Sequence, residues 1–126
     1  MAIALNEQSA SAVQRALESV RGPVISSATI VELSIVAASR VGTDGRTAVR
    51  AILETSGVVT MPVDDVQADL ATDAWLRFGK GNHPARLNYG DCFSYALAHH
   101  LEVPLLCVGN DFARTDLELI DVTHQG

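Results

Sequence analysis

Two acidic residues in the C-terminal half carry the clearest chemistry in this chain. Asp91 falls in the first turn of an expected helix, where Asn88 and Gly90 suit the turn and cap before it. A carboxylate at that point is favoured by the helix dipole. Asp111 follows residues 103–108, an apolar run typical of a buried strand. Because ligand sites in open α/β sheets lie at the ends of such strands, both acids are expected at one place.

Glu32 is a third candidate acid. It is the only acid of a helix expected over residues 29–40, which is apolar on almost every side. Helices of that kind are usually buried. Its carboxylate therefore has two interpretations: it reaches solvent or pairs with an arginine, or it binds a metal ion. The helix pattern alone does not separate them.

Together these acids indicate a metal site. Glu32, Asp91 and Asp111 lie far apart in sequence but near element ends that a parallel sheet can bring together. Oxygen ligands without a Cys or His cluster suit Mg²⁺ or Mn²⁺, and such ions commonly serve phosphoryl chemistry. A serine hydrolase and a nucleotide-binding P-loop are not favoured, since neither motif is present.

The composition indicates one domain with a real core. The chain has 126 residues, 48% of them apolar, and a net charge of −6 that argues against broad nonspecific nucleic-acid binding. Cys92 and Cys107 lie in apolar segments, which favours reduced thiols in a cytoplasmic protein. No signal peptide or membrane-spanning apolar run is visible.

Helices and strands alternate along the chain. The pattern predicts helices at about 6–20, 29–40, 46–55 and 64–78 and another running from Asp91 to Leu101, with a turn at residues 42–45. It predicts strands at 24–26, 58–62 and 103–108 and a weaker one at 117–122. Apolar strands alternating with helices favour an α/β fold, in which helices pack on a mainly parallel sheet.

Residues 79–98, followed by residues 109–112 and by Thr115 and Asp116, resemble the PIN-domain toxins of the VapC type. These are the ribonuclease halves of bacterial VapBC toxin–antitoxin pairs. Residues 26–33 are similar to the family's segment that bears its helical glutamate. The resemblance implies a PIN-like α/β/α sandwich with a central, mainly parallel sheet over residues 1–126. It also implies Mg²⁺-dependent RNA cleavage, a homodimer and inhibition by a VapB-type antitoxin.

The resemblance assigns the site residue by residue. The family's metal-binding acids fall on Glu32 and Asp91. Asn110 stands where many relatives have aspartate, which leaves Asp111 or Asp116 to supply the last carboxylate. The expected reaction is in-line attack by a water molecule on the phosphodiester, not attack by the 2′-hydroxyl. The sequence does not indicate which RNA is cut.

Two basic features are expected to serve RNA and the antitoxin. Four basic side chains precede Asp91 and form either an ordinary solvated loop or a positive rim that holds RNA phosphates; they are Arg77, Lys80, His83 and Arg86. The apolar helix at 29–40, with Arg46 and Arg50 after it, is expected to border the groove that takes the antitoxin's C-terminal segment.

The N-terminus departs from the family pattern. The family opens with a central strand and an aspartate, close to Ile-Val-Asp-Thr-Ser-Ala, whereas residues 1–7 are interpreted as the start of the following helix. We therefore expect the strand and the first metal-binding aspartate to be missing. A late start-codon assignment, a trimmed chain or a degenerate gene copy would each explain this, and the otherwise complete motifs favour the first. The alternative to an active ribonuclease is a catalytically impaired remnant that binds antitoxin without cleaving RNA.

Overall fold

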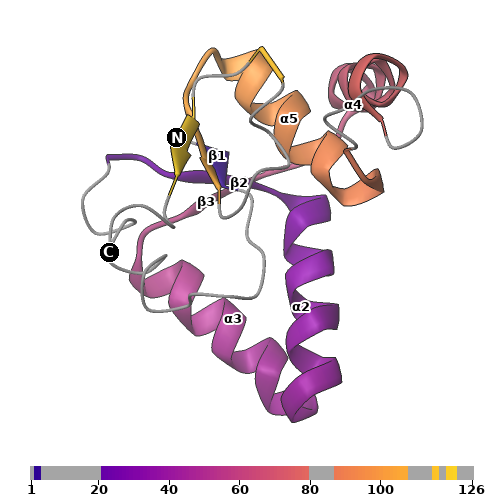
Figure 1. Ribbon diagram of the computed structural model, residues 1–126. Coiled ribbons are helices and arrows are strands. Elements are labelled where there is room, and N and C mark those ends of the chain that lie inside the picture. The colour runs from indigo at the N-terminus through magenta and orange to yellow at the C-terminus, as the bar shows by residue number, and fades with distance from the viewer. Residues whose placement is uncertain (1, 4–20, 80–86, 108–114, 117–118, 122–126) are drawn as a thin grey trace.

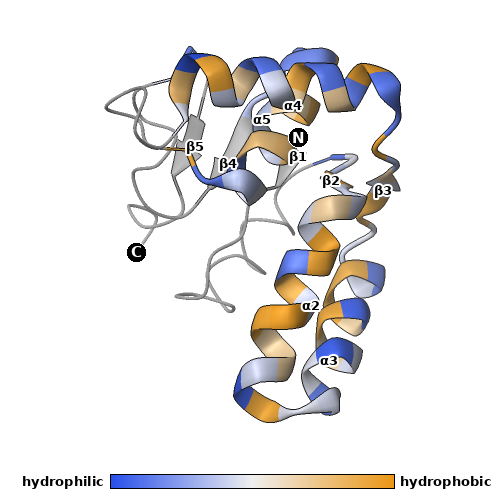
Figure 2. Cartoon of the chain, turned by 90° about the vertical axis from the view of Figure 1, so that its right-hand side faces the viewer, coloured by the Kyte–Doolittle hydropathy of each residue, from blue (hydrophilic) through white to orange (hydrophobic). Residues whose placement is uncertain are grey.

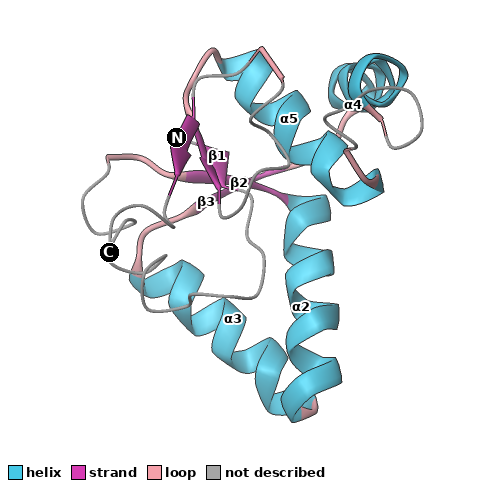
Figure 3. Ribbon diagram, viewed as in Figure 1, coloured by secondary structure: helices cyan, strands magenta, loops and turns pink. Residues whose placement is uncertain are grey.

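A central parallel sheet organises the protein. The structure, a computed structural model, describes residues 2–3, 21–79, 87–107, 115–116 and 119–121. Within these residues the sheet has five strands in the order β3-β2-β1-β4-β5, and every neighbouring pair is parallel. The strands are magenta in Figure 3. The strands are β1 (Ala2–Ile3), β2 (Val24–Ser26), β3 (Val59–Met61), β4 (Leu105–Cys107) and β5 (Leu119–Asp121). The predicted α/β class is confirmed.

The N-terminal strand is present, so the expectation that it is missing is wrong. Ala2 pairs with Val24 of β2 on one side and with Leu105 of β4 on the other, which puts β1 at the centre of the sheet. The local sequence suits a helix as well as a strand, and pairing with two neighbouring strands overrides that weak local preference. The helix expected at about 6–20 lies outside the described residues.

The strand order reverses beside β1. After β1 the chain adds β2 and β3 on one side, and β4 and β5 then continue on the other side. In open parallel sheets, ligands bind at the carboxyl ends of the strands beside such a reversal. The end of β2 leads directly into the helix that carries Glu32.

The described residues include four helices, which form two neighbouring pairs, α2 with α3 and α4 with α5 (Figure 1). They are α2 (Ser27–Val41), α3 (Thr43–Thr55), α4 (Asp65–Phe78) and α5 (Tyr89–Leu101). Gly42 alone joins α2 to α3, with φ of 76°, a conformation that glycine adopts without steric cost. The predicted turn was too long, because α3 already begins at Thr43.

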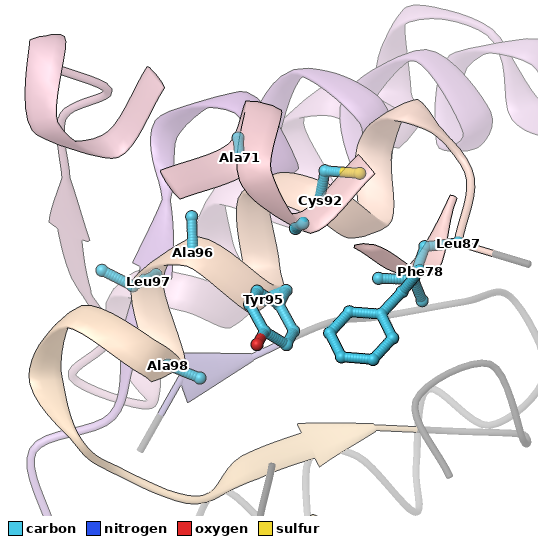
Figure 4. Packing of buried hydrophobic residues seen from close by; sticks show 9 residues of the cluster. Ala71, Phe78, Leu87, Cys92, Tyr95, Ala96, Leu97 and Ala98 are labelled. Carbon is cyan, nitrogen blue, oxygen red and sulfur yellow. The ribbon is translucent and has the colours of Figure 1, made fainter. Parts of the chain in front are cut away.

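The core lies between α4 and α5 and uses small side chains (Figure 4). Its buried members are Ala71, Ala74, Phe78, Leu87, Cys92, Tyr95, Ala96, Leu97 and Ala98. Alanines let the two helices approach closely, and the rings of Phe78 and Tyr95 fill the remaining space with centroids 5.4 Å apart. This packing holds α5, and with it Asp91, rigidly against the rest of the domain.

Helix α2 is more exposed than its composition predicts. Val31, Ile35 and Val41 are 58%, 61% and 65% exposed. With α3, this helix forms an arm that projects away from the sheet, and Figure 2 shows hydrophobic residues along it. The expectation of a buried helix is therefore wrong. Among the described residues, no helix combines the length and the hydropathy needed to cross a membrane.

Candidate active site

Asp91 is held by a reciprocal cap at the start of α5. The side-chain oxygen Oδ1 of Asn88 accepts a hydrogen bond from the Asp91 backbone N–H at 2.8 Å, and Oδ2 of Asp91 accepts from the Asn88 backbone N–H at 3.0 Å. This capping box satisfies helix N–H groups that would otherwise lack partners. The Leu87 N–H, which donates to the Phe78 carbonyl at 2.9 Å, ties the start of this turn to the end of α4.

The Glu32 carboxylate lies against the same turn of α5. A Cβ atom placed on Gly90 would clash with both carboxylate oxygens of Glu32. The carboxylate therefore occupies the space that a side chain at position 90 would need. Gly90 directly precedes Asp91, so the fold brings these two predicted site residues to one turn of helix.

Burial raises the pKa of Glu32 above its ordinary value, although the side chain is only partly buried. A carboxylate removed from water holds its proton more tightly unless a positive charge compensates it. A divalent cation would supply that charge. The carboxylate oxygens of Glu32 and Asp91 are donors of the kind that Mg²⁺ and Mn²⁺ prefer.

A pH-dependent stability follows from the raised pKa of Glu32. A raised carboxyl pKa contributes stability below the pKa of the unfolded chain, and that contribution is lost as the pH rises through the pKa of the folded state. Without metal, Glu32→Gln should therefore be more stable than the wild type at pH 7, and the difference should vanish near pH 3. Thermal unfolding in EDTA across this pH range measures it. The matched control is Glu54→Gln, which removes the same charge from an exposed position on α3.

Asp116 pairs with two other side chains. The hydroxyl of Tyr95 donates to its Oδ1 at 2.5 Å, and Nη2 of Arg77 lies 3.4 Å from its Oδ2. Nη1 of Arg77 also donates to the Tyr95 hydroxyl at 3.3 Å. Burial raises the pKa of Asp116, but the Tyr95 hydrogen bond and the Arg77 charge outweigh that effect and lower it. Asp116 and Arg77, predicted to serve metal and RNA, here bind each other.

Removing the Tyr95 hydroxyl should destabilise the protein modestly. Tyr95 is 2% exposed, so Tyr95→Phe leaves its ring packed but deletes the bond to Asp116, at a cost of about 1 kcal/mol in the free energy of unfolding. Because the pKa of Asp116 is lowered, the bond's contribution to stability is lost as the pH falls through that pKa. The difference in stability between the wild type and Tyr95→Phe should therefore narrow at low pH. Urea unfolding at several pH values tests this. Tyr89→Phe, at a 78% exposed tyrosine on the same helix, should be neutral.

The other predicted site residues fall largely outside the described part of the chain. They are Lys80, His83, Arg86, Asn110 and Asp111. Among the residues that the structure describes, no group of three or more His, Cys, Asp or Glu side chains is arranged to hold a metal ion. The described contribution to the predicted metal site is thus Glu32 with Asp91. Arg46 and Arg50 lie on the exposed surface of α3.

A groove of about 480 Å³ lies between α4 and α5. Its lining residues are Ala68, Ala71, Thr72, Trp75, Tyr89, Cys92 and Phe93. Burial, with a smaller contribution from the nearby Asp91 charge, raises the pKa of the Cys92 thiol to about 11. The thiol is therefore protonated at neutral pH and is not an activated nucleophile.

Sequence reasoning missed two residues of this region. Gly90 was read only as a turn residue, yet its missing side chain makes room for the Glu32 carboxylate. Tyr95 was read only as part of the helix, yet its hydroxyl binds Asp116. A signal for Tyr95 was present, because a tyrosine on an otherwise apolar, buried helix face needs a partner for its hydroxyl.

Comparison with known proteins identifies the family. The family model described as PIN domain matches residues 1–118. The chain is 41% identical over 109 residues to Ribonuclease VapC36 of Mycobacterium tuberculosis, covering 86% of this chain and 78% of that relative. It is 40% identical over 120 residues to Ribonuclease VapC of Mycolicibacterium smegmatis, covering 95% and 93%.

A solved structure has the same fold. It is VapBC-5 of Mycobacterium tuberculosis, described as a member of the VapBC family of toxin–antitoxin systems, with a TM-score of 0.56, 22% identity and 79% of each chain covered. The predicted PIN-like α/β/α architecture is therefore confirmed. The family model covers most of the chain, and these two relatives are about 40% identical to it over most of its length. The chain therefore belongs to the VapC ribonucleases of the PIN-domain family.

Proposed function

We propose that this protein is a Mg²⁺-dependent endoribonuclease, the toxin of a toxin–antitoxin pair, that hydrolyses phosphodiester bonds of RNA. The observation that carries the proposal is that the Glu32 carboxylate packs against Gly90, the residue before Asp91, in a chain of the VapC family. Mn²⁺ is expected to substitute for Mg²⁺, because both ions accept carboxylate oxygens.

The residues present fit a divalent cation. Glu32 and Asp91 would hold it, with Asp111, and Asn110 or Asp116 nearby, completing the ligands. A side chain at position 90 would fill the space that the Glu32 carboxylate occupies, so the glycine supports a site built for that carboxylate. When bound, the ion would polarise the phosphodiester and lower the pKa of an attacking water molecule.

The protein's own groups orient these ligands. The hydrogen bond from the Asn88 N–H fixes one oxygen of Asp91, and the close contact with α5 restricts the rotation of Glu32. A rim formed by Lys80, His83 and Arg86 would hold RNA phosphates beside them. Arg77 would join that rim only by leaving Asp116.

The test is cleavage of a 5′-labelled RNA in Mg²⁺, with EDTA and Glu32→Gln as controls. We expect cleavage that requires the metal and Glu32 and leaves 5′-phosphate and 3′-hydroxyl ends, because water is the nucleophile. Products with 2′,3′-cyclic phosphate ends, or equal cleavage in EDTA, would refute the proposal.

The proposed partner is a VapB-type antitoxin. Val31 and Ile35 are exposed apolar residues on the helix that carries Glu32, and they would accept a hydrophobic anchor of the antitoxin. An antitoxin arginine would then bind Glu32 and Asp91 and compete with the cation. Co-expression with the small protein encoded beside this gene should give a stable complex that Asp91→Ala weakens. Absence of association at micromolar concentration, with both proteins folded, would exclude this partner.

Two further properties belong to the proposal. A second copy of the chain would cover exposed apolar side chains of α4, such as Val66 and Leu76. We therefore infer a homodimer, which sedimentation equilibrium tests directly. The proposed location is the cytoplasm, where RNA is available and thiols stay reduced.

A further inference from the structure

A buried pair of hydroxyl groups joins α2 to α5. Oγ1 of Thr29 and Oγ of Ser94 lie 3.1 Å apart and are hydrogen bonded, and each residue is 2% exposed. The two residues are 65 positions apart in the sequence, so the bond is purely tertiary. It connects the helix that bears Glu32 with the helix that begins at Asp91.

The hydroxyl pair and the carboxylate contact lie one helical turn apart on both helices. Glu32 follows Thr29 by three positions on α2, and Ser94 follows Gly90 by four positions on α5. Residues three or four apart share one face of a helix. The two helices therefore meet at two successive points along one seam, first through the hydroxyl groups and then through Glu32 and Gly90.

A pair of hydroxyl groups restricts how α2 and α5 can pack against each other more tightly than apolar side chains would. A buried hydroxyl without a partner is costly, so Thr29 and Ser94 each favour only those helix arrangements in which the other is within reach. An apolar pair of similar size would tolerate small rotations and shifts of α2 against α5. Because Glu32 is one turn away, such shifts would move its carboxylate relative to Asp91.

We propose that Thr29 and Ser94 are positioning residues that set the register of α2 against α5 and thereby hold the Glu32 carboxylate beside Asp91. The inference rests on the proposed function for the metal that these acids bind. Outer groups that orient metal ligands change affinity by roughly 10–100-fold when removed, so a loss of about tenfold is expected here.

The experiment compares five variants of the full chain. Thr29→Val and Ser94→Ala each break the bond, the double variant makes the pair apolar, and Thr29→Ser retains a hydroxyl. Thr72→Val is the matched control, because the Thr72 hydroxyl is exposed and donates at 2.9 Å to the Ala68 carbonyl of its own helix. Mn²⁺ affinity is measured by calorimetry and stability by urea unfolding. In metal-free protein, nuclear Overhauser contacts between the Glu32 side chain and the Gly90 α-protons report the position of the carboxylate.

We expect both single variants and the double variant to bind Mn²⁺ about tenfold more weakly and to lose the Glu32–Gly90 contacts. The double variant should regain stability relative to the single variants, because no hydroxyl is then buried without a partner, but should not regain affinity. Thr29→Ser and Thr72→Val should bind like the wild type. If the double variant regained Mn²⁺ affinity together with stability relative to the single variants, the hydroxyl pair would contribute only to packing. That result would overturn the proposal.

The metal-free measurement separates this inference from the proposed function. If the wild type binds no Mn²⁺ and cleaves no RNA, the proposed function fails, whatever the variants do. The register inference then depends on the Glu32–Gly90 contacts alone. Their loss in the folded Thr29→Val and Ser94→Ala proteins would support it, and their persistence would refute it.

Discussion

Asp91→Asn should lower Mg²⁺-dependent RNA cleavage by more than about 100-fold, because loss of a metal ligand should exceed the 10–100-fold cost of losing an outer partner. The fold should survive. An asparagine oxygen can accept the Asn88 N–H as Oδ2 of Asp91 does at 3.0 Å, and the Asn88 side chain still caps the Asp91 N–H. We therefore expect the free energy of unfolding to change by less than about 1 kcal/mol.

The matched control for Asp91→Asn is Asp44→Asn. Asp44 also lies in the first turn of a helix, α3, but on the exposed surface and away from Glu32. Asp44→Asn removes the same charge from the first turn of a helix. It therefore shows how much the loss of a negative charge by itself changes RNA binding or the interaction with the helix dipole. Cleavage rates measured with both variants at several Mg²⁺ concentrations decide the matter. Equal losses in the two variants, or wild-type cleavage by Asp91→Asn, would remove Asp91 from the site.

Gly90→Ala should weaken Mn²⁺ binding at least tenfold and nearly abolish cleavage without unfolding the protein. The added Cβ would clash with Oε2 of Glu32, so the carboxylate has to leave its position. The Glu32 carboxylate is the far end of a flexible side chain, so it can move at little cost in the free energy of unfolding. Alanine is also favoured over glycine within a helix, by about 1 kcal/mol or less near its end. Function and stability should therefore change independently.

A double-mutant cycle with Glu32→Gln tests that mechanism. If Gly90→Ala acts only by displacing the Glu32 carboxylate, it should have no further effect on Mn²⁺ affinity once that carboxylate is gone. Calorimetry on the four proteins, with urea unfolding as the check on folding, measures the coupling. Additive losses in the double variant would show that Gly90 acts on the site by another route.

The sequence by itself determined the local features of this protein. Helix α4 was predicted as residues 64–78 from its amphipathic pattern. The observed helix begins one residue later, at Asp65, and Asp64 caps it by accepting from the Gln67 N–H at 2.9 Å. The position of Asp91 in the first turn of α5 followed from the same kind of signal. Strand β2 was predicted at its observed bounds. Such features depend on neighbours within a few positions, and their residue types are sufficient to predict them.

Tertiary structure alone decided how the acids are paired. Asp116 was predicted near the metal, but Tyr95 and Arg77 reach it from two other elements. The two residues of β1 became the central strand only because β2 and β4 pair with them on both sides. The contact of Glu32 with Gly90 joins residues far apart in sequence, on helices whose register depends on packing and on the Thr29–Ser94 bond. Contacts of this kind leave no local pattern, because their energy is gained only when the distant elements meet.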